Sequence, residues 1–128
     1  MTHTLNSPAL VAPLGHYSHV AVHQDLVYIS GQLPLASDGT ALYQESFGVQ
    51  AQQTLENLDQ CLVTAGTDRS RLLNLTAYIT DLDDWPAFDS LYAAWIGEHR
   101  PARAVVGVDR LHYGCVLEIQ AVASLPEN

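Results

Sequence analysis

The segment 47–65 most constrains the fold of this chain, because its apolar residues recur at steps of three and four, the period of one helix face. Polar residues such as Gln52 and Glu56 fall between them, and Gly66 follows where a helix of this length would end. A helix with an apolar stripe needs a second layer of structure to cover it. The expected stripe consists of Phe47, Ala51, Thr54, Leu55, Leu58, Cys61, Leu62 and Ala65.

The other apolar runs mostly alternate with polar residues, which is the pattern of half-buried strands. A second helix is predicted to begin near Asp83 or Asp84, to carry Pro86 in its first turn and to end at Gly97. The order ββ-α-β-α-ββ therefore predicts one α+β domain over residues 1–128, a mixed sheet with both helices on one face. The strands are expected at 19–23, 26–30, 73–80, 103–108 and 116–122.

The charge of the chain excludes several functions. Fourteen acidic residues oppose five basic ones, for a net charge of −9, and the sequence contains no lysine. Schiff-base chemistry and a phosphate-loop lysine are thereby excluded. An acidic surface also repels phosphate backbones, so we expect no nucleic-acid partner.

The chain has few signals for cofactors or for secretion. Cys61 and Cys115 are the only cysteines, with no C-x-x-C spacing, which excludes a zinc cluster or disulfide framework. Both thiols are expected to be inert, Cys61 on the buried stripe and Cys115 without an activating base. Residues 1–11 do not resemble a signal peptide, and no apolar run is long enough to span a membrane. We therefore expect a cytoplasmic protein with no membrane partner.

Histidines give the strongest hint of a metal site. His16, His19 and His23 lie close together in sequence, and His112 lies in a loop. No H-E-x-x-H motif or similarly spaced carboxylate accompanies them, so we expect no metal and no cofactor. His19 and His23 are instead expected to share a solvated face of the first hairpin.

The last two strands carry the most informative charged pair. Alternation places Ala104 and Val106 toward the helices and leaves Arg103 and Glu118 together on the other face of the sheet. That face has no helix to cover it, so a second subunit is the simplest cover. The guanidinium can bind a carboxylate, and Glu118 can deprotonate a water. Alternatively, the two side chains form a structural ion pair with each other.

Several short motifs resemble the Rid family, the enamine/imine deaminases also called YjgF-like or endoribonuclease L-PSP proteins. The resemblance runs in order and almost without gaps from about Gly15 to Ala123. The matching pieces are Gly15-His16-Tyr17-Ser18, Ile29-Ser30-Gly31-Gln32-Leu33-Pro34, Gln53-Thr54-Leu55-Glu56-Asn57-Leu58, Ala65-Gly66, Tyr78-Ile79-Thr80-Asp81, Tyr92, Pro101-Ala102-Arg103 and Leu117-Glu118-Ile119.

The resemblance implies a chorismate-mutase-like fold that assembles as a homotrimer, with a site in each cleft between subunits. It also implies a cofactor-free reaction in which water hydrolyses an enamine or imine, here a small carboxylated one, to a ketone and ammonia. Arg103 would hold the substrate carboxylate, and Glu118 would direct the attacking water. Tyr17 and Ser30 would line the pocket, while backbone at Gly31 and Val105 would contact the ligand.

Four residues depart from the usual pattern of the family. His16 replaces a proline, Val105 replaces a cysteine, Asp89 stands where an asparagine before the second-helix tyrosine is common, and His112 replaces a proline. Asp89 is therefore also expected at the substrate pocket. These changes point to a divergent subgroup with its own substrate.

Three functions follow from the resemblance. The first is a 2-iminobutanoate/2-iminopropanoate deaminase-like hydrolase, which converts 2-imino acids to 2-keto acids. The second is a pathway-specific enamine hydrolase of the aminomuconate type, and the third is a non-catalytic, ligand-binding or chaperone-like trimer. The ribonuclease activity in the family's older name is disfavoured by the net charge of −9.

Overall fold

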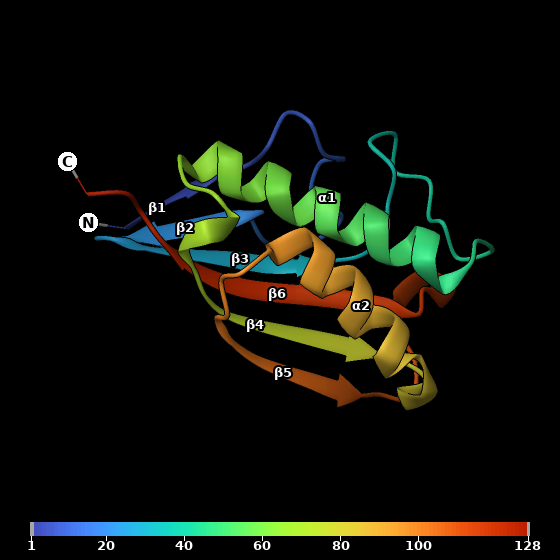
Figure 1. Cartoon of the computed structure of the whole chain (residues 1–128). Coiled ribbons are helices and arrows are strands. Elements are labelled where there is room, and N and C mark those ends of the chain that lie inside the picture. The colour runs from blue at the N-terminus through green and yellow to red at the C-terminus, as the bar shows by residue number, and fades with distance from the viewer. Residues whose placement is uncertain (1, 128) are drawn as a thin grey trace.

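A computed structural model describes residues 2–127, whose six strands form one sheet in the order β1-β2-β3-β6-β4-β5. The sheet is antiparallel except where β4 and β5 run parallel. Both helices cover the same face of the sheet, as Figure 1 shows. The strands are β1 (Thr2–Leu5), β2 (Val20–His23), β3 (Leu26–Gln32), β4 (Leu72–Ile79), β5 (Ala102–Gly107) and β6 (Leu117–Ser124).

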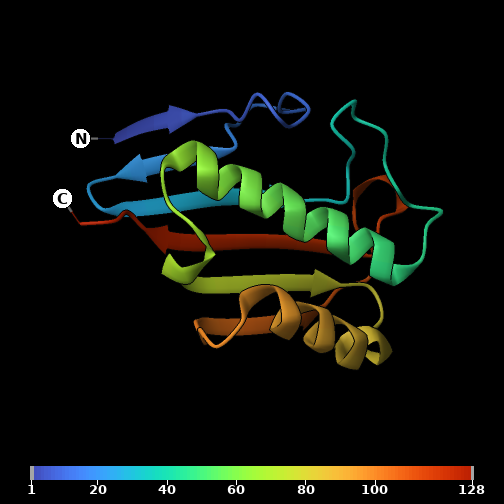
Figure 2. The ribbon, with the colours of Figure 1, turned by 45° about the horizontal axis from the view of Figure 1, so that its top comes forward.

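Helix α1 (Phe47–Ala65) confirms the prediction from the apolar period. Ser46 caps its first turn by accepting a hydrogen bond from the backbone N–H of Val49. Gly66 ends it with φ of 88°, a left-handed conformation that favours glycine. The buried stripe of α1 packs on β6 and β3 in the centre of the sheet (Figure 2).

Helix α2 (Trp85–Ile96) carries Pro86 near its start and ends at Gly97, as predicted. Asp84 occupies the N-cap position, but its side chain makes no capping hydrogen bond. The cap lies one turn earlier, where the carboxylate of Asp81 accepts from the N–H of Asp83 and begins the short helix Leu82–Asp84.

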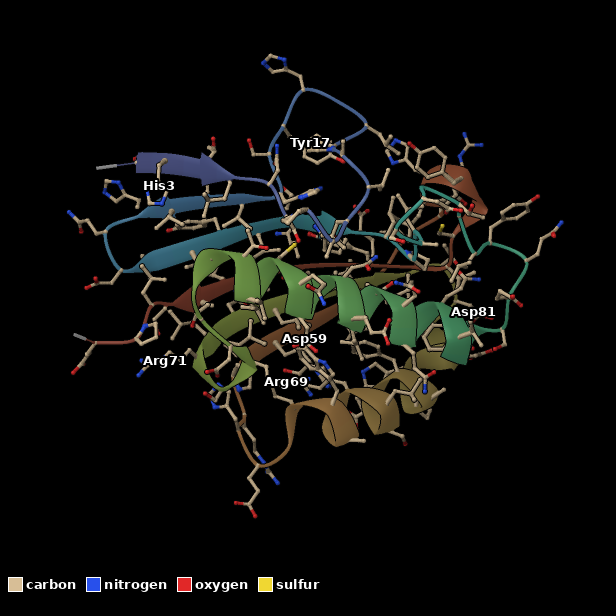
Figure 3. All side chains as sticks on the ribbon, turned by 90° about the horizontal axis from the view of Figure 1, so that it is seen from above. His3, Tyr17, Asp59, Arg69, Arg71 and Asp81 are labelled. Carbon is tan, nitrogen blue, oxygen red and sulfur yellow. The ribbon has the colours of Figure 1, made fainter. Side chains whose placement is uncertain are left out.

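The two helices are joined by a polar contact around Asp59 of α1. Its carboxylate accepts hydrogen bonds from Arg69 at 2.7 Å and from the indole N–H of Trp95 of α2 at 3.0 Å. Arg69 also lies over the Trp95 ring, 4.7 Å from the ring centroid. Figure 3 shows Asp59 and Arg69 side by side between the helices. The contact adds a polar link to the apolar packing between α1 and α2.

Strand β5 contradicts the predicted orientation. Its register opposite β4 pairs Leu75 with Arg103 and Ala77 with Val105, and partners in a parallel ladder point to the same side. Because Leu75 and Ala77 are buried under the helices, Arg103 and Val105 face the helices as well. Alternation misled the prediction because β5 is an edge strand with apolar residues on both faces.

Glu118 of β6 has the opposite orientation. Leu117 and Ile119 on either side of it are fully buried in the helix-facing core, so Glu118 points to the open face. The predicted juxtaposition of Arg103 and Glu118 on one face within a single chain is therefore wrong. The open face also carries polar and aromatic residues, among them Tyr28, Thr76, Tyr78 and Gln120. No helix of residues 2–127 covers this face (Figure 1).

Histidine 19 is also placed differently from the prediction. It is only 4% exposed, and its Nδ1 accepts a hydrogen bond from the N–H of Ser7 while Nε2 donates to the carbonyl of Val11, both at 3.0 Å. The ring is thus neutral with its proton on Nε2. It holds residues 7–11, which follow β1, a strand that the sequence pattern did not predict.

Candidate active site

One hollow of about 380 Å³ lies where the end of β3 meets the start of β6. Its polar lining comes from Tyr17, Ser30, Gly31, His112, Tyr113 and Glu118. The structure therefore brings four of the predicted site residues together, namely Tyr17, Ser30, Gly31 and Glu118. Figure 3 shows Tyr17 on the loop before β2, at the outer side of the sheet.

Gly31 makes the space that the Glu118 carboxyl group occupies. Strand β3 has an irregular register against β6 between Ile29 and Gln32, which brings the Gly31 backbone close to the Glu118 side chain. A Cβ added at Gly31 would lie 3.0 Å from Cδ of Glu118 and still closer to Oε2. Any larger residue at position 31 would displace the carboxylate.

The environment of Glu118 suits a side chain that exchanges a proton with a ligand or water. Burial raises its pKa above the usual glutamate value, while the nearby His112 charge lowers it. No hydrogen bond or ion pair engages the carboxylate among residues 2–127. Its oxygens are thus free to accept a proton or to orient a water molecule in the hollow.

Ser30 has a structural bond that limits its role. Its hydroxyl donates to the carbonyl of Ser18 at 2.6 Å, and its N–H donates to the carbonyl of His19. The Ser30 oxygen can accept a hydrogen bond from a ligand, but its proton is already engaged. Ser30 also ties the Tyr17–Ser18 loop to β3, which places Tyr17 at the rim.

Arg103 lies in a second hollow, of about 410 Å³, between α2 and the segment 97–103. Its Nη1 donates to Oδ1 of Asp89 at 2.8 Å. The guanidinium also lies over the ring of Tyr92, 5.1 Å from the centroid. A structural ion pair between Arg103 and Glu118 of the same chain, the predicted alternative, is therefore wrong, since Asp89 is the partner.

The predicted site residues thus fall into two groups within one chain. Tyr17, Ser30, Gly31 and Glu118 line the first hollow, whereas Asp89 and Arg103 line the second. Val105 follows Arg103 on the same face of β5. The first group contains the predicted base, Glu118, and the second contains the predicted receptor for a substrate carboxylate, Arg103. Neither group contains both.

Two residues of these hollows were not singled out from the sequence as binding residues. Tyr113 has φ of 61°, an unusual backbone conformation for a residue other than glycine, and lies 51% exposed at the rim. Tyr92 is 6% exposed, and its hydroxyl has no hydrogen-bond partner in the part of the chain that the structure describes. Burial raises the pKa of that hydroxyl, so it stays protonated. Tyr92 was noted only as part of the family resemblance, because an aromatic residue on an apolar stripe gives no other signal.

The thiols and histidines show no second centre. Burial raises the pKa of Cys61 to about 12, and burial together with Glu118 raises that of Cys115. Both cysteines are buried and free, which confirms that Cys61 belongs to the buried stripe of α1. Among residues 2–127 no group of three or more His, Cys, Asp or Glu side chains could hold a metal ion. No helix in that part of the chain is long and apolar enough to cross a membrane.

The fold and the first hollow define a class of small α+β proteins in which one carboxylate, here Glu118, lies at the start of a central strand. Comparison with known proteins identifies that class: the sequence pattern of the endoribonuclease L-PSP family matches residues 7–125. The chain therefore belongs to this family, which is the Rid or YjgF-like family.

Individual relatives agree with this assignment. The RutC family protein y4sK of Sinorhizobium fredii is 37% identical over 95% of this chain and 94% of its own length. Reactive Intermediate Deaminase A of Arabidopsis thaliana is 32% identical over 89% of this chain and 61% of its length. The structure of Escherichia coli TdcF with bound serine has a TM-score of 0.90 and 28% identity, covering 97% of this chain and 99% of TdcF.

Proposed function

We propose that this protein hydrolyses small, carboxylated imines or enamines to 2-keto acids and ammonia. The observation that carries the proposal is the unpaired, half-buried Glu118 carboxylate at the bottom of a hollow that Gly31 keeps open. A carboxylate with a raised pKa, no partner and access to water suits proton transfer to and from a water molecule. The similarity to a protein named as a reactive intermediate deaminase supports the same reaction class.

The reaction needs only a base and a carboxylate receptor. Water adds to the carbon of the protonated imine, the C=N electron pair moves to nitrogen, and Glu118 takes the proton of the water. Glu118 then returns that proton to nitrogen, and the C–N bond breaks to release ammonia. The remaining hydroxyl loses its proton as the ketone forms, and this proton leaves with ammonia as ammonium.

The receptor for the substrate carboxylate is Arg103, so we propose that a site contains residues from two copies of the chain. Arg103 and Glu118 of one chain open on different faces of its sheet. Among residues 2–127, strand β5 pairs only with β4, and no strand pairs with its other edge. The N–H of Val108 donates to Ile79 of β4, so by alternation the N–H of Val105 points out of that free edge. Arg103 and this N–H of one copy would face the Glu118 hollow of another.

We propose that the assembly is a homotrimer. A second copy of the chain would cover the open sheet face and the unpaired edge of β5. Sedimentation should then give a mass near three times 14.0 kDa. A monodisperse monomer would contradict the shared site.

A cytoplasmic location also stays a prediction.

A binding protein without turnover is the second candidate, favoured by the Asp89 carboxylate that already occupies part of Arg103. A coupled assay distinguishes the two. An amino-acid oxidase generates 2-imino acids in the assay mixture. Their hydrolysis is followed by the release of ammonia, or by the decrease in the semicarbazone that forms when semicarbazide traps the remaining imino acid. Faster hydrolysis than in buffer, lost in Glu118→Gln, supports the enzyme. Ligand binding with hydrolysis at the buffer rate supports the binding protein.

A further inference from the structure

The ion pair between Arg103 and Asp89 places a fixed negative charge beside the proposed carboxylate receptor. Asp89 reaches only Nη1 of the guanidinium, at 2.8 Å. An arginine has five N–H donors, so the rest of its fork remains available to a ligand. A ligand carboxylate bound there would lie close to the Asp89 carboxylate.

Solvent screens the two charges only in part, although the Asp89 side chain is 42% exposed. The Arg103 side chain is 22% exposed, and its guanidinium lies within 6 Å of the ring centroids of Trp85, Phe88 and Tyr92. Like charges in such a partly dry setting repel more strongly than they do in water. A ligand that brings only a carboxylate therefore meets both an attraction to Arg103 and a repulsion from Asp89.

A ligand that carries a positive charge next to its carboxylate avoids this conflict. A protonated 2-imino acid has an iminium nitrogen one bond from the carbon that bears the carboxylate, and this cation is attracted by Asp89. Hydrolysis replaces the cationic nitrogen with a neutral carbonyl oxygen. The product keeps the repulsion and loses the attraction.

We infer that Asp89 is a specificity-determining residue, which selects protonated imino acids over the 2-oxo acids that they become. The inference rests on the proposed function, in which Arg103 receives the substrate carboxylate. It assigns Asp89 a role that an asparagine at the same position cannot perform, because an amide is neutral. Weak binding of the product would also speed its release.

The test compares two stable ligands with the same carbon skeleton by calorimetry. 2-Oxobutanoate represents the product, and L-2-aminobutanoate carries the cationic nitrogen of the imine. Asp89→Asn removes the charge and keeps the shape. The control Asp25→Asn removes one exposed charge from the β2–β3 turn, far from Arg103 in the chain, and shows the effect of net charge alone.

We expect Asp89→Asn to bind 2-oxobutanoate roughly three- to tenfold more tightly and L-2-aminobutanoate no more tightly, given typical couplings between partly exposed charges. Asp25→Asn should leave the ratio of the two dissociation constants unchanged. An equal change for both ligands in Asp89→Asn would overturn the role of Asp89 while carboxylate binding stands. If neither the parent nor the variants bind either ligand, the proposed function fails, and this inference fails with it.

Discussion

Replacing Gly31 with alanine adds one methyl group at the point where β3 approaches the Glu118 carboxyl group. The new Cβ would lie 3.0 Å from Cδ and 3.3 Å from Cγ of Glu118, whereas ordinary contact between such atoms begins at 3.4 Å. The distance to Oε2 would be shorter still. The backbone at Gly31 is not in the left-handed region, so the added methyl group brings no strain of its own.

The side chain of Glu118 is flexible at its end, so we expect it to turn away rather than the sheet to deform. The carboxylate must move by about 1 Å, and a displacement of that size in a catalytic group lowers turnover roughly hundredfold. The free energy of unfolding should change by less than about 1 kcal/mol, since the methyl group meets only this movable side chain.

The matched control is Gly48→Ala in the first turn of α1, where an added Cβ meets no atom within 4 Å. Both variants are compared by kcat/KM in the oxidase-coupled assay and by urea unfolding. Gly48→Ala should keep the parent activity and gain slight stability from its better helix propensity. If Gly31→Ala hydrolyses imines at the parent rate, the placement of Glu118 at the reacting carbon is wrong.

Three further predictions address the receptor, the base and the fold. Arg103→Ala should lower kcat/KM by roughly thirty- to several-thousand-fold, because one partner of a partly buried charge pair is removed; parent-like kinetics would rule out Arg103 as the receptor. Activity should fall as the pH drops through the raised pKa of Glu118, and His112→Gln should move this acidic limb to higher pH, because the charge that lowers the pKa is gone. A limb that stays in place or moves down would show that Glu118 is not the base. Asp59→Ala should cost about 1–2 kcal/mol of unfolding free energy in urea, since Arg69 and Trp95 both lose an acceptor; an unchanged midpoint would mean that this contact does not join the helices.

The sequence predicted correctly the segments that bury only one of their faces. The stripe of α1 has one period and a glycine at its end, and Leu117 and Ile119 of β6 alternate cleanly with polar residues. In these segments only one orientation buries the apolar side chains, so the period determines the structure.

The predictions failed where the local sequence pattern is compatible with two orientations or two environments of a side chain. Ala104 and Val106 are as apolar as Val105, so alternation along the edge strand β5 does not reveal which side faces the helices. His19 is polar, but its two ring nitrogens are satisfied by Ser7 and Val11, and such long-range partners have no signal in sequence.

The candidate site was predictable as a set of residues but not as an arrangement. The motifs around Tyr17, Ser30 and Glu118 lie far apart in the sequence, and the fold gathers them in one hollow as expected. The separate place of Arg103 depends on the register of β5 and on Asp89, which only the structure reveals.

The most direct test of the shared site mixes two inactive variants. Chains with Arg103→Ala and chains with Glu118→Gln are produced together with different affinity tags, and assemblies that contain both are isolated. If each site takes Arg103 from one copy and Glu118 from its neighbour, every trimer that contains both variants keeps one intact site of three, so about a third of the parent activity should return. Activity no higher than that of either variant alone would show that the two residues do not act together across copies.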